Sequence, residues 1–268
     1  MTGTTANPSP AVARGAGPAA PAAARVGFLY PGHSAEDDFP RMEKLLNEAG
    51  AGVGLPLVHT DIGTDAHRVD ALREMGSVDR LVAVLGELLA REVAAVVWAC
   101  TSASFVYGHE GAAEQVRRLS EAAGLPASST SFAFAHAVRE IGVRRVAVAA
   151  TYPEDVAGLF AGFLRAAGSE VVAMRGSGII TAAEVGTWGR AEVRALALAG
   201  DDPAAEAVLL PDTALHTAAW VPELEEALGK PVLTANQVTA WEGLRLLGQP
   251  VPPCPALGSL FSRAPARA

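Results

Sequence analysis

The chain has 268 residues, of which 50% are hydrophobic, 19% charged and only 6% aromatic. This composition excludes a wholly disordered protein, allows one large domain or two modest ones, and predicts a core built mainly from Ala, Val and Leu. The net charge of −8 at pH 7 argues against a nucleic-acid binder, which needs a basic surface, and favours small solutes as partners.

The two ends differ in composition from the rest of the chain. Residues 1–24 are mostly Ala, Pro, Gly, Ser and Thr, so we expect a disordered tail, and its four prolines interrupt the apolar stretch that a secretory signal needs. Residues 249–268 are rich in proline and are expected to be mostly irregular.

Between the ends, short Val-rich runs alternate with amphipathic stretches, which is typical of parallel strands covered on both faces by helices. The expected strands are Val26–Tyr30, Val53–Val58, Ala94–Ala99, Val146–Ala150, Glu170–Met174, Ala207–Leu210 and Pro231–Thr234. The expected helices are Ala35–Ala49, Val78–Arg91, Gly111–Ala123, Ser131–Ile141, Glu154–Ala167, Arg190–Ala199, Pro222–Leu228 and Gln237–Leu247. Left-handed caps are predicted at the glycines that follow five of these helices, Gly50, Gly124, Gly142, Gly168 and Gly229.

The pattern of elements restarts near the middle of the chain. The strand at Val26 and the acidic helix after it are echoed by the strand at Val146 and the helix after Tyr152. Cys100-Thr-Ser after one strand is echoed by Asp212-Thr after another. We therefore predict two similar α/β lobes, with ligands at the carboxyl ends of the parallel strands. The first lobe is expected to comprise residues 25–124 with 235–248, and the second residues 125–234.

The turn that follows the strand at 94–99 offers a thiol, Cys100, and two hydroxyls, Thr101 and Ser102. Free backbone N–H groups and hydroxyls in such a turn can cradle a carboxylate, and they would lower the pKa of the thiol toward a usable thiolate. The alternative is that Cys100 is a small buried hydrophobic residue at a strand end.

Other loops at strand ends add polar groups to the same cleft. Asp212 and Thr213 follow the strand at 207–210, where an Asp is also a common helix cap, and His216 nearby is expected to be structural or solvent-facing. Tyr152 can donate its phenol into the cleft or simply pack. The first loop, Tyr30-Pro31-Gly32-His33-Ser34, offers further polar groups.

Several familiar sites are absent from the sequence. It contains no phosphate-loop lysine motif, no Gly-x-Ser-x-Gly elbow and no complete dinucleotide turn. The six histidines show no compact metal-binding spacing, so no metal and no cofactor are predicted. The two cysteines, Cys100 and Cys254, are too isolated for a disulfide scaffold, and no apolar run reaches the ~18 residues that span a bilayer. A cytoplasmic location is expected, and the Ala-rich composition is compatible with a homo-oligomer.

These loops together resemble the maleate isomerase and arylmalonate decarboxylase family of the wider aspartate/glutamate racemase superfamily. The resemblance runs from about Val26 to Gly248. Its strongest stretches are Val96-Val-Trp-Ala-Cys-Thr-Ser-Ala-Ser-Phe105, Ile141-Gly-Val-Arg-Arg-Val-Ala-Val-Ala-Ala-Thr-Tyr-Pro-Glu-Asp-Val156, Leu209-Leu-Pro-Asp-Thr213, Leu228-Gly-Lys-Pro-Val-Leu-Thr234 and Trp241.

The resemblance implies two Rossmann-like lobes with parallel sheets related by pseudo-two-fold symmetry, with the active site in the cleft between them. It also implies catalysis on a small carboxylate or dicarboxylate without metal or organic cofactor. The family's isomerases and racemases present one cysteine from each lobe, whereas its decarboxylases keep only the second-lobe cysteine. Cys100 matches the first-lobe cysteine, but Asp212 stands at the second-lobe position.

The resemblance assigns oxyanion binding to Thr101, Ser102 and Tyr152, and it places Pro31, Ser34 and Thr213 beside the substrate. Ser34 falls near an asparagine of the isomerases, which weakens the case for maleate itself. At position 212 a carboxylate, with a reference pKa of about 3.9, replaces a thiol, whose reference pKa is about 8.5. Asp212 would therefore act as a base, or it would need burial to deliver a proton.

The expected function is a cofactor-independent isomerase or racemase of a small carboxylate, with Cys100 as nucleophile or proton carrier and Asp212 opposite it. A decarboxylase that uses Cys100 to protonate an enediolate is the first alternative. The second is a small-carboxylate binding protein without catalysis.

Overall fold

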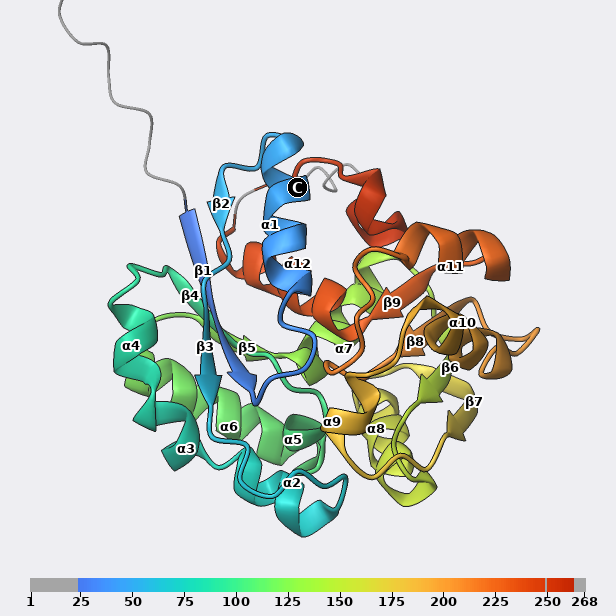
Figure 1. Ribbon diagram of the computed structural model, residues 1–268, viewed down its shortest axis with the longest axis horizontal. Coiled ribbons are helices and arrows are strands. Elements are labelled where there is room, and N and C mark those ends of the chain that lie inside the picture. Colours follow the sequence, from blue (N-terminus) through green and yellow to red (C-terminus); the bar gives the residue numbers. More distant parts are fainter. Residues whose placement is uncertain (1–23, 249, 263–268) are drawn as a thin grey trace, which may run out of the picture.

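The computed structural model describes residues 24–248 and 250–262, and its strands form two separate parallel sheets (Figure 1). The first sheet contains β1 (Ala24–Pro31), β2 (Val53–Gly54), β3 (Leu57–Thr60), β4 (Ala95–Trp98) and β5 (Ala127–Ser129). The second contains β6 (Arg145–Ala150), β7 (Glu170–Gly176), β8 (Ala207–Leu210) and β9 (Val232–Thr234). The predicted tail at 1–24 lies outside the described residues except for Ala24, which begins β1.

Helices connect the strands and pack around both sheets (Figure 1). Those of the first half are α1 (Asp38–Glu48), α2 (Val69–Met75), α3 (Val78–Ala83), α4 (Leu85–Leu89), α5 (Ser102–Phe105), α6 (Gly108–Ala123) and α7 (Thr130–Glu140). Those of the second half are α8 (Glu154–Ala166), α9 (Ala182–Val185), α10 (Arg190–Ala199), α11 (Val221–Leu228) and α12 (Ala235–Leu246), followed by the 3₁₀ turns η1 (Pro255–Leu257) and η2 (Ser259–Phe261). Within the described ranges, none of these helices has the length and apolar character needed to cross a bilayer.

The two sheets share one topology, which confirms the predicted two-lobed α/β fold. In the first sheet β1 lies between β3 and β4, and β5 follows at the far side of β4. In the second sheet β6 lies between β7 and β8, and β9 follows at the far side of β8. The strands β4 and β8 are therefore equivalent, and so are the loops that carry Cys100 and Asp212.

The strand β5 was not expected, and it moves the predicted boundary between the lobes. It pairs with β4 in the first sheet, although the sequence predicted that residues after 124 belong to the second lobe. Its sequence is Ala-Ser-Ser, with two buried hydroxyl groups in place of apolar side chains. The Ser128 hydroxyl donates to Glu242, and the Ser129 hydroxyl pairs with that of Ser104. A strand whose buried side chains are polar and hydrogen-bonded shows no apolar run in its sequence, so the hydrophobic pattern does not predict it.

Other differences concern short elements. The strand expected at 53–58 is divided into β2 and β3, and Pro56 between them has no N–H to donate to a ladder. The helix expected at 78–91 is divided into α3 and α4. The helices α2, α5 and α9 were not expected, and each has only four to seven residues.

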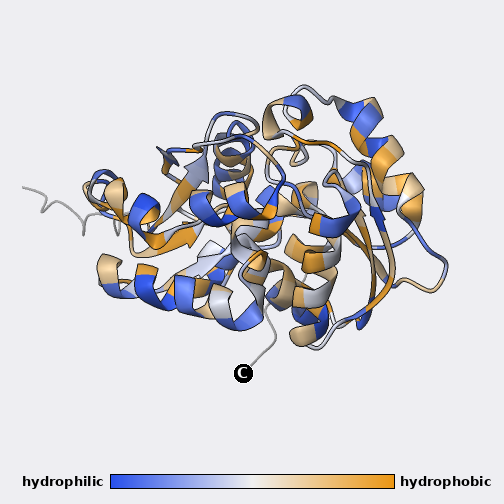
Figure 2. Cartoon of the chain, turned by 90° about the horizontal axis from the view of Figure 1, so that it is seen from below, coloured by the Kyte–Doolittle hydropathy of each residue, from blue (hydrophilic) through white to orange (hydrophobic). Residues whose placement is uncertain are grey.

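The core consists of the strands and the inner faces of the helices (Figure 2). All of β4 and β8 is buried, because parallel strands covered on both faces leave no side for water. Positive φ angles confirm the left-handed conformation at all five predicted glycines, Gly50, Gly124, Gly142, Gly168 and Gly229. At Gly76 a Cβ atom would lie 2.0 Å from the Ala103 carbonyl oxygen, so only glycine lets this turn approach α5 so closely.

A buried polar cluster joins the first lobe to the loop after β8. The Asp38 carboxylate, at the start of α1, accepts hydrogen bonds from the backbone N–H groups of Thr217 (2.9 Å) and Ala218 (3.2 Å). Asn236, at the start of α12, donates to Asp38 at 3.1 Å and to the Thr213 carbonyl at 3.1 Å. Burial raises the pKa of Asp38 even though these hydrogen bonds oppose it. The loop that carries Asp212 is thereby held against the first lobe.

Candidate active site

The ends of β4 and β8 face one small cavity between the two sheets. Cys100 and Asp212 both line it, and their exposed fractions are 3% and 4%. The volume that the centre of a water molecule can occupy inside the cavity is about 20 Å³, so the cavity has room for one or two water molecules. Six of the eight predicted site residues line the cavity: Pro31, Ser34, Cys100, Ser102, Asp212 and Thr213.

Burial dominates the chemistry of Cys100. It raises the pKa of the thiol to about 11, although the Ala103 N–H and the Ser102 hydroxyl, 3.8 Å from the sulfur, act in the opposite direction. The negative charge of Asp212 raises the pKa further. The sequence prediction of a lowered thiol pKa is therefore wrong, because the cost of a buried thiolate exceeds the help from the turn. At neutral pH Cys100 is a thiol that can give a proton.

Asp212 is fixed by hydrogen bonds to both of its carboxylate oxygens. Oδ1 accepts from the backbone N–H of Ala214 at 2.9 Å, and Oδ2 accepts from the hydroxyl of Thr151 at the end of β6. The next helix, α11, begins only at Val221, so Asp212 does not cap a helix. Its carboxylate is instead held at the cavity by its own loop and by the neighbouring strand.

His67 is a buried site residue that sequence reasoning missed. Its Nε2 atom lies 3.9 Å from Oδ2 of Asp212, and both side chains are only 5% exposed. Its Nδ1 atom lies 2.9 Å from the carbonyl oxygen of Ile179. A carbonyl oxygen only accepts, so Nδ1 carries a proton and Nε2 is the nitrogen that faces Asp212. No local motif surrounds His67, and only the packing of two distant loops brings it to the site.

Thr101 and Tyr152 lie next to the cavity but do not line it. The Tyr152 hydroxyl donates to the Pro211 carbonyl at 2.8 Å, and its ring packs edge-on against His67 with centroids 4.8 Å apart. Burial, and then the charge of Asp212, raises the pKa of Tyr152 well above its ordinary value. The Thr101 hydroxyl is buried and makes no hydrogen bond of good geometry to any described residue. It lies near the Tyr152 hydroxyl, whose pKa it lowers slightly against the effect of burial, and it remains available as a donor beside Cys100.

Two loops, one from each lobe, close over the cavity. The Asp65 carboxylate accepts hydrogen bonds from the backbone N–H groups of Ala182 (2.8 Å) and Ala183 (3.0 Å) at the start of α9. The backbone N–H of His67 donates to the Ile180 carbonyl at 2.6 Å. On the other side, the Tyr30 hydroxyl donates to the Thr213 carbonyl at 2.7 Å. Segments of both lobes thus enclose Cys100 and Asp212.

The charges at the cavity restrict what it can hold. Within the described ranges, no Lys or Arg lines it, whereas the carboxylates of Asp65 and Asp212 both do. An anionic ligand would therefore have to be held by neutral N–H and O–H donors, and a second negative charge near Asp212 would be repelled. The arrangement favours a ligand with a single carboxylate.

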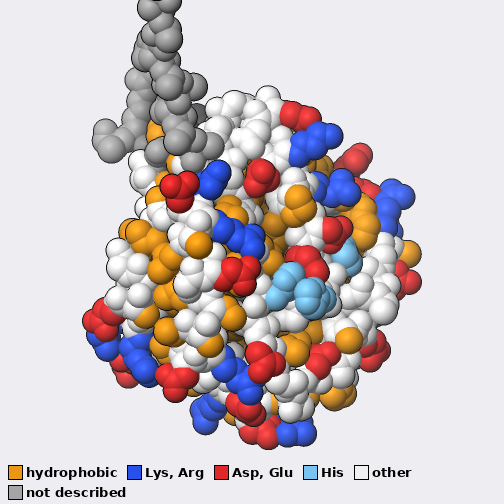
Figure 3. Space-filling model, turned by 60° about the vertical axis from the view of Figure 1, so that its left-hand side comes forward, with side chains coloured by type: hydrophobic (Ala, Val, Ile, Leu, Met, Phe, Trp, Pro, Cys, Tyr) orange, Lys and Arg blue, Asp and Glu red, His pale blue; other side chains and the backbone are white. Residues whose placement is uncertain are grey.

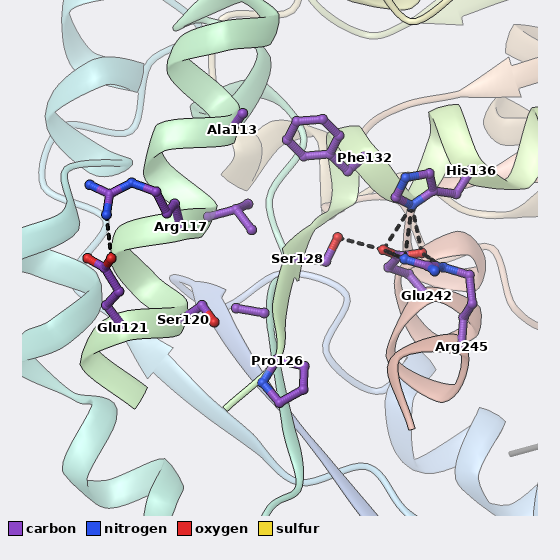
Figure 4. A pocket seen from close by; sticks show the side chains of 12 residues that line it. Ala113, Arg117, Ser120, Glu121, Pro126, Ser128, Phe132, His136, Glu242 and Arg245 are labelled. Carbon is purple, nitrogen blue, oxygen red and sulfur yellow. Dashed lines mark hydrogen bonds and ion pairs between the residues drawn. The ribbon is translucent and has the colours of Figure 1, made fainter. Parts of the chain in front are cut away.

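A larger hollow of about 550 Å³ lies elsewhere, where α6, β5, α7 and α12 meet (Figure 4). Its ionisable groups are already paired with one another. The fully buried Glu242 accepts hydrogen bonds from Ser128 (2.6 Å) and Arg245 (2.7 Å) and pairs with His136 at 3.0 Å. Arg117 on the opposite wall pairs with Glu121. Among the described residues that line this hollow, the ionisable groups are all paired, and Cys100 is not one of them.

Comparison with known proteins assigns the chain that carries this site to a family. The family profile described as "Arylmalonate decarboxylase" matches residues 67–261, which include Cys100 and Asp212. The chain is 33% identical to arylmalonate decarboxylase of Bordetella bronchiseptica over 169 residues, which cover 61% of this chain and 69% of that protein.

Solved structures show the same fold. A Cys→Ala variant of the maleate isomerase Iso from Pseudomonas putida S16 with maleate matches with a TM-score of 0.80 at 23% identity, covering 89% of this chain and 97% of that one. A liganded arylmalonate decarboxylase with one Gly→Cys and one Cys→Ser substitution matches with a TM-score of 0.71 at 25% identity, covering 88% of this chain and 99% of that one. The resemblance inferred from the loops is confirmed: the chain belongs to the arylmalonate decarboxylase family.

Proposed function

We propose that this protein is a cofactor-independent racemase or isomerase that moves a proton at the carbon next to a small carboxylate. The observation that carries the proposal is the placement of Cys100 and Asp212. They come from equivalent loops of the two sheets and line one small cavity, and one is a neutral thiol while the other is a carboxylate fixed by two hydrogen bonds.

Such a pair suits proton transfer on the two faces of one carbon. Asp212 takes the proton from the carbon, and the electron pair of that C–H bond moves onto the substrate carboxyl group to give an enediolate. The Cys100 thiol then gives its proton to the opposite face of the carbon. The cycle leaves a Cys100 thiolate and a protonated Asp212, which is the form that catalyses the reverse transfer.

The enediolate needs donors at its oxygens, and the hydroxyls beside Cys100 are suited to this role. Ser102 lines the cavity, and Thr101 has a hydroxyl that the described residues leave without a good hydrogen bond. We assign both hydroxyls to the substrate carboxyl group, with Tyr152 as a third donor when it turns from the Pro211 carbonyl. Removing one preorganised donor of this kind costs about 10²- to 10³-fold in kcat.

His67 supports Asp212 in the proposed reaction. Its Nε2 atom lies 3.9 Å from Oδ2 of Asp212, so a movement of about 1 Å would bring the two atoms within hydrogen-bond distance, and the Ile179 carbonyl fixes its orientation. Because Asp65 and Asp212 make the cavity negative, we propose a substrate with one carboxylate rather than a dicarboxylate. Pro31, Ser34 and Thr213 would then contact its other substituents.

Decarboxylation is the second candidate, and the family profile and the Bordetella relative favour it. In that reaction a malonate loses CO₂, the electron pair of the broken C–C bond forms the enediolate, and Cys100 protonates it. Asp212 then has no proton to remove, and its charge would oppose the second carboxylate of the substrate. A protein that binds a carboxylate without catalysis is the remaining alternative.

One experiment separates these three functions. The protein is incubated in D₂O with an enantiopure 2-arylpropionate and, separately, with the matching arylmalonate. We expect deuterium at C2 and loss of optical activity from the first substrate, with no CO₂ from the second. Cys100→Ser and Asp212→Asn should each lower the rate by about 10²-fold or more, whereas Cys254→Ser should not.

The other outcomes are equally distinct. Release of CO₂ that needs Cys100 but survives Asp212→Asn would establish the decarboxylase and refute the racemase. Binding of the carboxylates without deuterium incorporation or CO₂ would leave only the binding protein.

A further inference from the structure

A group of histidine and glutamate side chains lies outside the cavity, and Figure 3 shows a face on which histidine side chains gather beside acidic ones. Over the described ranges, one group of three or more His, Cys, Asp or Glu side chains has the geometry to hold a metal ion: His33, Glu36 and His59. The sequence predicted no metal site because no two histidines are spaced as in a local motif. The fold brings His33 and His59 together from a loop and a strand that are separated by α1.

The distances within this group suit a tetrahedral metal ion. Oε1 of Glu36 lies 3.2 Å from Nδ1 of His33 and 3.5 Å from Nε2 of His59, and all three ligand atoms lie within 4.8 Å of one another. Ligands at bond lengths of about 2.0–2.1 Å in a tetrahedron are separated by about 3.3–3.4 Å. A single ion can therefore reach the three atoms after only small side-chain movements.

Two of the three ligands are already held in place. His59 lies on β3, where it is in register with Tyr30 of β1. Oε2 of Glu36 accepts the backbone N–H of Ser34 at 2.7 Å, which leaves Oε1 toward the histidines. The carboxylate is thus oriented toward the two histidines.

The Nε2 atom of His59 has almost no contact with solvent and makes no hydrogen bond to any described residue. Its contact with Oε1 of Glu36, at 3.5 Å, is an ion pair only when the imidazole is protonated, so the neutral ring leaves Nε2 open to a ligand. The His33 ring lies over the His59 ring with centroids 3.8 Å apart, so the two rings present nitrogens to the same point beside Glu36. His33 is 74% exposed, which leaves the point accessible to an ion from solution.

We propose that His33, Glu36 and His59 bind one divalent transition-metal ion of the zinc class. Two imidazole nitrogens and one carboxylate are a common ligand set for zinc with an open fourth position, and imidazole also suits nickel, cobalt and copper. The ion ties the loop after β1 to β3. Ser34 of that loop lines the cavity, so the ion also fixes one wall of the candidate active site.

The test uses tag-free protein that has been treated with a chelator and dialysed. Zn²⁺ binding is measured by titration calorimetry, and Co²⁺ replaces it to give an absorption spectrum that reports the ligands. We expect one ion per chain and a higher melting temperature with Zn²⁺, because the ion binds the folded state. Binding should weaken as the pH falls, since histidines must lose their protons to bind metal.

Variants assign the ion to this group of side chains. Glu36→Gln keeps an acceptor for the Ser34 N–H but removes the charge, and His59→Asn removes the ligand on β3; each should weaken Zn²⁺ binding by at least about tenfold. His216→Asn is the matched control, because His216 is 29% exposed, close to the 35% of His59, and pairs with Asp37. Cys100→Ser excludes coordination by the cavity thiol. Both controls should bind Zn²⁺ as the natural protein does.

Two results would overturn the proposal. The first is that the natural protein binds no Zn²⁺ and shows no shift in melting temperature, which would leave an ion-paired cluster only. The second is that Cys100→Ser abolishes binding while Glu36→Gln and His59→Asn retain it. Neither result depends on the reaction proposed for Cys100 and Asp212.

Discussion

Residues beside the cavity show how burial changes the role of an ordinary side chain. Cys100 sits at a turn with free N–H groups, yet enclosure between two sheets raises the pKa of its thiol to about 11. A thiol of this kind gives a proton to a carbanion more readily than it attacks a carbon as a preformed thiolate. The hydroxyl of the neighbouring Thr101 is also buried, and it makes no hydrogen bond of good geometry to any described residue. The buried hydroxyl without a good hydrogen bond is costly for folding and is suited to binding an anion.

The Thr101 hydroxyl gives a sharp prediction. Thr101→Val removes a donor that makes no good hydrogen bond in the described part of the chain, so the melting temperature should stay the same or rise slightly. If the hydroxyl stabilises the enediolate, kcat should fall by about 10²- to 10³-fold. Thermal unfolding and deuterium exchange at the substrate carbon measure the two effects.

The control for this prediction is Thr130→Val. Thr130 is equally buried, but its hydroxyl pairs with that of Thr239 at 2.6 Å. The loss of this partner should cost about 1–3 kcal/mol of stability and leave kcat unchanged. Equal stability losses in both variants with full activity in each would exclude Thr101 from the reaction.

Among the secondary-structure elements, a single buried carboxylate holds β5, α7 and α12 together. Glu242 on α12 reaches Ser128 on β5 and His136 on α7, and Arg245 covers it from the next turn of its own helix (Figure 4). Burial alone would raise the pKa of Glu242, but the hydrogen bonds from Arg245, His136 and Ser128 outweigh burial and lower it to about 2. The carboxylate therefore stays ionised inside the fold.

A pH dependence of stability follows from this shift. The pKa of Glu242 is lower in the folded chain than in the unfolded one, so its contribution is present above about pH 4.5 and is lost as the pH falls toward about 2. The full contribution is on the order of 3 kcal/mol. Glu242→Gln lacks this titration, so its stability deficit relative to the natural protein should shrink between pH 5 and pH 2.

Urea unfolding at several pH values measures the deficit. Glu87→Gln serves as the control, because Glu87 forms an exposed pair with Arg91 and such pairs contribute about 0–1 kcal/mol. The control should track the natural protein at every pH. A deficit for Glu242→Gln that stays constant with pH would show that the carboxylate is not selectively stabilised in the folded chain.

The whole molecule is organised so that two similar sheets present equivalent loops to one another. The contacts between the lobes around the cavity include the Asp38 cluster, the contact between Tyr30 and Thr213, and the contact of Asp65 with the start of α9. The cavity between the lobes is small. A substrate larger than a few water molecules can therefore enter only if one of these contacts between the lobes breaks. Asp65 makes the most exposed of the three contacts.

Removal of the Asp65 carboxylate should loosen the cover of the cavity. In Asp65→Ala, the N–H groups of Ala182 and Ala183 lose their acceptors, so hydrogen exchange at residues 60–68 and 177–186 should accelerate by roughly tenfold or more. Asp65→Asn keeps one accepting oxygen and should give an intermediate rate. Exchange in β4 and β8 should not change. Uniform acceleration across both sheets would instead indicate general destabilisation.

The repeated α/β pattern and the loops that line the candidate active site can both be predicted from the sequence alone. Apolar runs such as those at β4 and β8 are long enough to identify buried parallel strands, and glycines at helix ends have a local conformational reason to be there. The equivalence of Cys100 and Asp212 was also visible, because each follows a strand in the same order along its half of the chain. These features depend on neighbours in the sequence.

The side chains that surround these residues cannot be predicted in this way, because they are brought there by the packing of distant segments. His67 reaches Asp212 because a loop of the first lobe meets residues 179–180 of the second. His33, Glu36 and His59 converge because β1 and β3 pair in register. The pKa of Cys100 rises because two sheets exclude water from it. Contacts between distant segments and burial leave no periodic trace in a sequence, since both depend on how complete elements pack against one another.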